Sequence, residues 1–331
     1  MPRTGVPIKT LSIVTPVFNE QECLPEFYRR LTAALANCGL EAYEIILVDD
    51  GSLDRTPAIL AELVEKDARI KVLTLSRNFG HHPAVFAGLA VAVGEAVVIV
   101  DADLQDPPEL VPRLLAERNN GYELVFARRR VSEGEPILLR FLKRRFRVLM
   151  KRLSNIDFPD DVGVFSVMDR PLKELLLTMP ERERYLVAMQ MYLGYRVGFV
   201  DYDRAPRQGG TPKQTLRRLF RLGMNSIFSY SSLPLQFSMI ASCACLVLAA
   251  AGISYVLYAK FISNVAIVGW ASVMTAILGM GAVQLFSLWI VCEYVDRIFE
   301  NVKGRPYYVV RSQQGVQGMD RCTEGDVRRG A

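Results

Sequence analysis

Three acidic motifs carry the residue types best suited to chemistry in this 331-residue chain. The strongest is Asp101-Ala102-Asp103, which follows a β-branched run that we expect to be a buried strand. Side chains at positions i and i+2 of an extended segment point the same way, so both carboxylates face one point. Two hard oxygen ligands suit Mg²⁺ or Mn²⁺, with phosphate oxygens and water completing the coordination. We therefore predict a divalent-metal site; a capped turn, which needs one carboxylate, is the alternative.

The other two motifs end the first two expected strands. One is Pro-Val-Phe-Asn-Glu at residues 16–20, and the other is Asp-Asp-Gly at 49–51. An Asp-Gly turn after a strand is common, so neither motif is informative alone. In a parallel sheet, however, ligands bind at the carboxyl ends of the strands, and all three motifs fall there. Together they predict one shared site.

The elements that must position these motifs alternate regularly along the first half of the chain. Residue periodicity predicts strands over 11–17, 43–48, 70–75, 96–100 and 123–127, and helices over 22–37, 56–66, 83–93 and 109–119. This alternation indicates an α/β fold with a parallel sheet covered on both faces. A dinucleotide oxidoreductase is disfavoured because no G-x-G-x-x-G follows the first strand.

The second half of the chain contains two long stretches without charge. One lies between Arg221 and Lys260 and the other between Lys260 and Glu293. Each exceeds the roughly 20 residues that cross a hydrocarbon core. Basic residues precede the first stretch and follow the second, which by the positive-inside rule places both ends in the cytoplasm. We therefore predict an integral protein of the bacterial inner membrane, with the first domain cytoplasmic.

These patterns divide the chain into four expected parts. They are a cytoplasmic α/β domain at 1–210, an amphipathic juxtamembrane helix at 211–232, a transmembrane hairpin at 233–293 (spans at about 235–259 and 267–291), and a cytoplasmic tail at 294–331. The tail after Arg311 is rich in Gln, Gly and Arg and is expected to be disordered. The basic and apolar stretch at 138–153 fits either a membrane interface or an ordinary surface helix.

Composition narrows the range of partners. The net charge of +5 comes with clustered Arg and Lys, which favours anionic partners such as phosphate or a lipid surface. Nucleic acid is disfavoured because no recognition motif accompanies the charge. The six cysteines show no metal-binding spacing and are expected to be reduced. His81 and His82 stand at a helix start, where capping or packing is the favoured interpretation.

The three acidic motifs, in this order and spacing, resemble the family 2 glycosyltransferases with a GT-A fold, a Rossmann-like and mostly parallel sheet. The resemblance continues in Ser-Arg-Asn-Phe-Gly-His at 76–81, in residues 101–108, in Glu-Tyr-Val-Asp-Arg at 293–297 and in Arg-Pro-Tyr-Tyr at 305–308. These runs are similar to polyisoprenyl-phosphate glycosyltransferases, such as bactoprenol glucosyltransferases and the undecaprenyl-phosphate aminoarabinose transferase. Dolichol-phosphate mannose synthases are more distantly similar. The match covers residues 11–308.

The resemblance implies an inverting, metal-dependent glycosyltransferase. The donor is a nucleotide diphosphate sugar, UDP-glucose or a related UDP-sugar, and the acceptor is a polyisoprenyl phosphate such as undecaprenyl phosphate. The product is a polyisoprenyl-phosphate-linked monosaccharide. The implied cofactor is Mg²⁺ or Mn²⁺, the membrane is an expected partner, and the chain is expected to form a homo-oligomer.

Roles for individual residues follow from the same resemblance. The donor nucleotide is bound by Pro16, Phe18, Glu20, Asp50, Asp101, Arg204, Arg207 and Lys213. The metal is held by Asp101, Asp103 and Gln105, and the acceptor phosphate by Arg129 and Arg144. Catalysis is assigned to Asp161, Asp103, Arg129 and Arg144. The family usually has Tyr where this chain has Phe18, and Pro212 interrupts the usual pattern of the basic loop next to Lys213.

Two other functions fit parts of the pattern. A processive polysaccharide synthase shares the fold and acidic motifs, but no Arg precedes Trp270 or Trp289 as in the Gln-x-x-Arg-Trp motif of such enzymes. A non-catalytic nucleotide-binding membrane scaffold would need a broken carboxylate pair, and the pair is intact. A phosphate monoester is already anionic near neutral pH, since its second pKa is about 6. Asp161 is therefore expected to orient a group more than to remove a proton.

Overall fold

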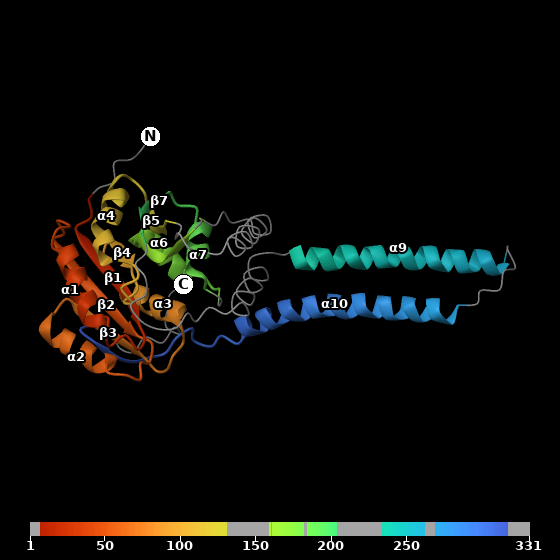
Figure 1. Cartoon of the computed structure of the whole chain (residues 1–331), viewed down its shortest axis with the longest axis horizontal. Helices are drawn as coiled ribbons and strands as arrows, with labels where there is room; N and C mark the ends of the chain where they lie inside the picture. Colours follow the sequence, from red (N-terminus) through yellow and green to blue (C-terminus); the bar gives the residue numbers. More distant parts are fainter. Residues whose placement is uncertain are drawn as a thin grey trace. The chain divides into compact units, whose positions relative to one another are not determined.

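The computed structural model describes residues 7–130, 159, 161–181, 184–203, 233–261 and 269–316, and the statements below concern these residues. The chain divides into two compact units. The first, at 1–142, 156–212 and 305–331, is a layered α/β structure, and the second, at 143–155 and 213–304, contains two long helices (Figure 1).

One sheet of eight strands forms the centre of the first unit. Its order is β7-β5-β6-β4-β1-β2-β3-β8. The strands are β1 (Thr10–Val17), β2 (Ala42–Asp49), β3 (Ile70–Leu75), β4 (Ala96–Ile99), β5 (Leu124–Arg129), β6 (Val162–Asp169), β7 (Val197–Tyr202) and β8 (Val310–Gln314). The five strands expected from periodicity are all present, with ends that differ by at most two residues.

The sheet is mixed. β1 pairs in parallel with β2 and β4, and the β2–β3 and β5–β7 pairs are also parallel. β6 runs antiparallel between β4 and β5, and β8 runs antiparallel to β3. A mostly parallel sheet was expected, and the parallel core β3-β2-β1-β4 agrees with it. The antiparallel strands β6 and β8 lie where sequence periodicity predicted no strand.

Helices cover both faces of the sheet. On one face lie α1 (Leu24–Leu35), α2 (Thr56–Lys66) and α4 (Val111–Asn119), and on the other α3 (His81–Val91), α6 (Arg170–Thr178) and α7 (Leu186–Tyr192). α1 shows why such segments are helical. Its buried Leu24, Phe27, Leu31 and Leu35 recur on one face at helical spacing. A short 3₁₀ helix, η1 (Pro108–Leu110), leads into α4.

The C-terminal segment completes one edge of the sheet. Ser76 N donates to Val309 O at 2.8 Å, and Arg311 Nη2 donates to Ser76 O at 2.8 Å. The ring of Tyr307 packs edge-on against Phe86 of α3, with centroids 5.8 Å apart. The expectation of disorder directly after Arg311 is therefore wrong for the residues of β8. The side chains of β8 are mostly exposed, so backbone pairing with β3 holds the strand rather than burial.

The second unit contains α9 (Leu233–Phe261) and α10 (Trp270–Val302), which pack against each other. Within the described residues neither helix combines the length and apolarity needed to cross a membrane. The predicted transmembrane hairpin is therefore wrong, and with it the assignment as an integral membrane protein. The prediction rested on two long apolar stretches without charge, whereas a membrane span needs sufficient length and apolarity within one helix.

Candidate active site

The carboxyl ends of three neighbouring parallel strands bring the acidic motifs together. β2, β1 and β4 lie side by side and end at Asp49, Val17 and Ile99. Asp50 N donates to Val17 O at 2.9 Å, which joins the first two strand ends directly. This is the edge of the sheet at which ligands bind in such folds.

Asp50 is buried and ties the end of β2 to the loop after β3. Phe79 N donates to Asp50 Oδ1 at 2.7 Å, and Gly80 N donates to Asp50 Oδ2 at 2.9 Å. Burial raises the pKa of Asp50, although both backbone N–H groups act in the opposite direction. Gly51 has φ +74°, and a Cβ there would lie 2.8 Å from the carbonyl carbon of Arg77. Only glycine allows this close approach of the two chain segments.

His81 links the loop after β3 to the Asp101-Ala102-Asp103 motif. Its Nε2 lies 2.7 Å from Asp101 Oδ1. Burial favours the neutral ring, but the hydrogen bond to Asp101 and the charges of Asp101, Asp103 and Asp50 outweigh it, so the pKa of His81 is raised. Carboxylates of the second and third motifs therefore lie near enough to His81 to raise its pKa, and that of Asp101 contacts the ring directly.

The Cys23 thiol, at the start of α1, is influenced by carboxylates of the first and third motifs. Burial raises the pKa of Cys23, and Glu20 and Asp103 raise it further. Glu20 N donates to Thr56 Oγ1 at 3.0 Å at the start of α2. Pro16 is buried within β1, whereas the Phe18 ring is 38% exposed at its end. Phe18 is therefore accessible for stacking on a flat ligand.

The Asp101-Ala102-Asp103 motif lies in the loop between β4 and η1. Asp103 Oδ1 accepts a hydrogen bond from Gln105 N at 3.1 Å, and Gln105 is largely buried. Among the described residues no group of three or more His, Cys, Asp or Glu side chains is placed to hold a metal ion. The donor set still fits a hard divalent ion, because two carboxylates in one loop can share it with phosphate oxygens of a substrate.

Arg129 lies at the end of β5 and faces the same loop. Its Nη2 donates to Asp106 Oδ2 at 3.3 Å, and its Nε donates to Tyr202 Oη at 3.0 Å. Burial lowers the pKa of Arg129, but Asp106 and Tyr202 more than compensate, so its pKa is raised and the guanidinium stays charged. A half-buried fixed cation is suited to binding a phosphate.

Asp161 immediately precedes β6 and lies beside Arg129 through the backbone. Its carbonyl oxygen accepts a hydrogen bond from Arg129 N at 2.9 Å. Its φ is +58°, a left-handed conformation that Asp tolerates better than most residues. Asp161 is exposed, so its carboxylate is accessible to solvent and ligands.

Comparison with known proteins identifies the family. Residues 12–176 match the family model described as Glycosyl transferase family 2, and this range holds the acidic motifs, Arg129 and Asp161. An uncharacterized glycosyltransferase from Synechocystis is 38% identical over 93% of this chain and 96% of its own length. The chain belongs to glycosyl transferase family 2. A bactoprenol glucosyl transferase from Shigella phage SfII is 33% identical over 91% of this glycosyltransferase and 97% of its own length.

The motif resemblance and the prediction of an enzyme are thus confirmed for this glycosyltransferase. Among solved structures, glucosyl-3-phosphoglycerate synthase from Mycobacterium tuberculosis, in complex with Mn²⁺, UDP and glucosyl-3-phosphoglycerate, is similar at 20% identity. The match covers 66% of this chain and 78% of that chain, with a TM-score of 0.46.

Several residues assigned from the resemblance lie outside the described part of this glycosyltransferase. They are Arg144, Arg204, Arg207 and Lys213. The basic stretches at 138–153 and 211–232 lie outside it as well. Their roles remain predictions.

Sequence reasoning missed three residues of the site. His81 was assigned to capping or packing, although its position directly after the third expected strand places it at the same sheet edge as the acidic motifs. Asp106 was treated as part of a motif without a role of its own. Tyr202 ends β7, a strand that sequence periodicity did not predict, so no sequence signal indicated its contact with Arg129.

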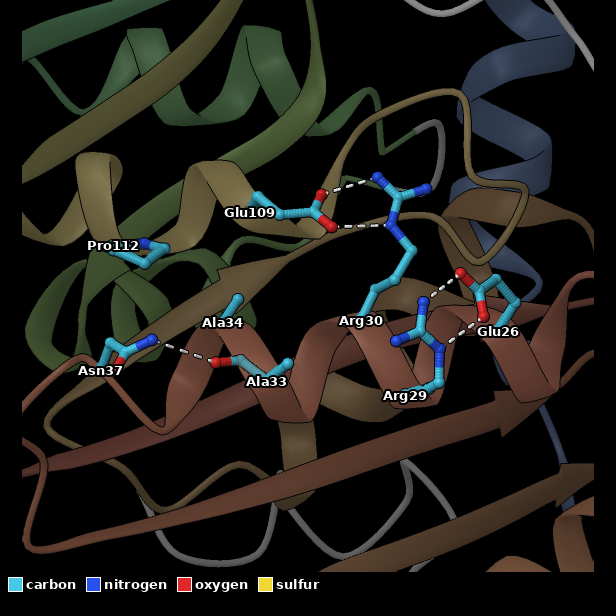
Figure 2. Close-up of a pocket in the computed structure, with 8 residues that line it drawn as sticks. All are labelled: Glu26, Arg29, Arg30, Ala33, Ala34, Asn37, Glu109 and Pro112. Atoms are coloured by element: carbon cyan, nitrogen blue, oxygen red, sulfur yellow. Dashed lines mark hydrogen bonds and ion pairs between the residues drawn. The ribbon is translucent and has the colours of Figure 1, made fainter.

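A separate shallow hollow lies on the outer face of α1, where it meets η1 and α4 (Figure 2). Two ion pairs border it: Arg29 with Glu26, and Arg30 with Glu109, each through two hydrogen bonds of 2.6–2.7 Å. The hollow is lined by none of the assigned site residues of the glycosyltransferase. Its cations are already paired, so it offers little to an anionic substrate.

Proposed function

We propose that this family 2 glycosyltransferase moves one sugar from a nucleotide diphosphate sugar to the phosphate of a polyisoprenyl phosphate. The observation that carries the proposal is the full-length similarity to bactoprenol glucosyl transferases, at 33% identity over 91% of this chain. The placement of Arg129 opposite the carboxylate loop supports it. UDP-glucose or a related UDP-sugar is the proposed donor, and undecaprenyl phosphate is the proposed acceptor.

The donor binds at the carboxyl ends of β1, β2 and β4 in this proposal. Phe18, with Pro16, Glu20 and Asp50 around it, contacts the base and ribose; Asp50 does so while also holding the loop at Phe79 and Gly80. Arg204, Arg207 and Lys213 contact the diphosphate. The catalytic domain spans 1–210 and provides all of these residues except Lys213, which follows it.

Asp101, Asp103 and Gln105 would hold Mg²⁺ or Mn²⁺. When bound, such an ion neutralises charge that develops on the leaving diphosphate. Loss of these carboxylates leaves that charge without compensation. Asp103 therefore contributes to catalysis as well as to binding.

The acceptor phosphate binds to Arg129 and Arg144, and its oxygen attacks the anomeric carbon from the face opposite the diphosphate. The new bond joins that carbon to the phosphate oxygen. The bond to the diphosphate oxygen breaks, and its electron pair leaves with the nucleoside diphosphate. Configuration is inverted. No proton has to be removed, because the second pKa of a phosphate monoester is about 6. Asp161 consequently orients the acceptor or an arginine.

A panel of nucleotide sugars incubated with the full-length protein and undecaprenyl phosphate tests the proposal. One nucleotide sugar, with UDP-glucose the first candidate, should yield a lipid carrying a single sugar and an equal amount of nucleoside diphosphate. Repeated addition of sugar would identify a processive synthase instead. Size measurement of the same preparation tests the predicted homo-oligomer.

A further inference from the structure

A buried carboxylate connects the metal loop to the proposed acceptor arginine. Asp106 follows Asp101 and Asp103 in the same loop but is only 1% exposed. Tyr202 donates its O–H to Asp106 Oδ1, and Arg129 Nη2 donates to Asp106 Oδ2 at 3.3 Å. Each carboxylate oxygen of Asp106 thus has a donor. Burying an ionised carboxylate is costly unless it is paired in this way.

Tyr202 closes the network from the neighbouring strand. Its oxygen accepts a hydrogen bond from Arg129 Nε at 3.0 Å while its O–H is given to Asp106. The ring is only 4% exposed and packs edge-on against Phe165, with centroids 6.5 Å apart. The loop after β4 and the end of β7 therefore hold the guanidinium that β5 carries, although the three segments are distant in sequence.

Gly163 leaves room for that guanidinium on its remaining side. A Cβ at Gly163 in β6 would lie 2.9 Å from Arg129 Nη2 and 3.5 Å from its Cζ. The absence of a side chain at this position leaves the space that the guanidinium occupies. Because the neighbouring atoms are the flexible end of Arg129, an added methyl group would displace that end without disturbing the backbone.

We propose that Asp106 and Tyr202 are positioning residues that fix the Arg129 guanidinium relative to the Asp101–Asp103 loop. The inference rests on the proposed function, in which Arg129 binds the acceptor phosphate and this loop binds the donor diphosphate. Holding both groups on one network fixes the separation of nucleophile and leaving group. Proximity of this kind lowers the barrier, because less freedom is lost when the reactants align.

The neighbouring residues of the same two strands offer a matched control. Arg128 Nε and Nη2 donate to the carboxylate of Asp201 at 2.6 and 3.1 Å. This pair is also an Arg of β5 with a residue of β7, but both side chains are substantially exposed. Exposed ion pairs contribute little to stability. The Asp201→Asn variant therefore breaks an adjacent ion pair without touching Arg129.

The experiment compares Tyr202→Phe, Gly163→Ala and Asp201→Asn in the full-length protein. Tyr202→Phe keeps the ring and removes both hydrogen bonds, whereas Gly163→Ala moves the Arg129 tip and leaves Asp106 and Tyr202 unchanged. KM for undecaprenyl phosphate, KM for the nucleotide sugar, kcat and the Tm are measured for each. We expect both network variants to lower kcat/KM for the lipid phosphate by roughly 10-fold or more, the effect of one lost hydrogen bond to a charged group. KM for the donor should stay within about twofold of wild type, and Asp201→Asn should match wild type throughout.

Two results would overturn the inference. One is unchanged use of the lipid phosphate in either Tyr202→Phe or Gly163→Ala. The other is an equal loss for donor and acceptor accompanied by a lower Tm, which indicates a network that only stabilises the fold. A wild-type protein that transfers no sugar to any lipid phosphate contradicts the proposed function itself, which is a different outcome from selective failure of the variants.

Discussion

His81 Nε2 lies 2.7 Å from Asp101 Oδ1, so an imidazole at the start of α3 contacts a carboxylate at the end of β4. The pair joins two loops that are 20 residues apart in sequence. Because Asp50 holds the loop that leads to His81, the second and third acidic motifs are connected through it. The carboxylate that we propose as a metal ligand is thus oriented by a neighbouring ring.

Removal of the carboxylates that we propose as metal ligands should abolish transfer. We expect Asp103→Ala to lower kcat by at least roughly 100-fold, because charge on the leaving diphosphate loses its main compensation. Asp101→Ala should do the same but also removes the partner of His81, so Asp103→Ala is the cleaner test. Excess EDTA should inactivate the wild type, and Mg²⁺ or Mn²⁺ should restore it.

The control for this series is Glu109→Gln, which removes an exposed carboxylate from η1 and breaks only a surface pair with Arg30 among its described contacts. It should retain wild-type kcat and the same response to EDTA. Full turnover of the wild type in chelator would show that no divalent ion takes part.

Asp161→Asn tests whether a general base is needed. Asn also tolerates the left-handed backbone at this position, where φ is +58°, so the fold should be kept. The proposed orienting role predicts a loss in kcat smaller than roughly 100-fold and an unchanged pH–rate profile. A true base would cost roughly 10²- to 10⁴-fold and would remove a limb from that profile.

Gly51 should be far less tolerant of a side chain than Gly39. Both glycines have positive φ, so alanine at either position carries a similar backbone strain of about 1–2 kcal/mol. A Cβ at Gly39 meets nothing within 4 Å, whereas one at Gly51 overlaps the backbone of Arg77. Urea unfolding should therefore show that Gly51→Ala loses at least about 1 kcal/mol more than Gly39→Ala. Equal losses would mean that the close approach of these segments is unimportant.

His82 should make the protein less stable in acid. Burial, followed by the charge of His81, lowers the pKa of His82 to about 4, and its Nδ1 has no hydrogen-bond partner among the described residues. In the unfolded chain its pKa is about 6.5, so between pH 6.5 and 4 the unfolded state binds the extra proton and is favoured. This destabilisation is absent above pH 6.5. As the pH falls from 6.5 to 4, it grows by up to roughly 1.4 kcal/mol per pH unit.

His82→Phe removes this titration and keeps a ring against Tyr185, whose centroid lies 5.7 Å from that of His82. Denaturant unfolding at pH 7, 6 and 5 should show a smaller loss of stability with acid in the variant than in the wild type. Parallel pH dependences in the two proteins would show that His82 does not titrate as its burial implies.

Much of the parallel core could be predicted from sequence because local periodicity determines it. The apolar runs of β1, β2 and β4 are buried on both faces, and the motifs directly after them reach one edge of the sheet by geometry alone. The family and its enzymatic activity followed from the same motifs. The exact contacts of Asp50 with residues 79 and 80 did not, because they depend on how two loops fold together.

What sequence could not indicate depends on contacts between distant segments. β8 is polar and exposed, and pairing with β3, more than 230 residues earlier, is what makes it a strand. Arg129, Asp106 and Tyr202 meet only when β7 lies beside β5. The transmembrane hairpin was predicted from two long uncharged, apolar stretches, but no described helix has the length and apolarity that a span requires.

The most direct test of the central claim compares undecaprenyl phosphate with undecaprenol as acceptor, under the same donor and metal conditions. The product is followed by mass spectrometry, together with release of nucleoside diphosphate. We predict one sugar added to the lipid phosphate, through its phosphate, and no product from the alcohol. Transfer to the alcohol at a similar rate, or no transfer to the phosphate with any nucleotide sugar, would contradict the account.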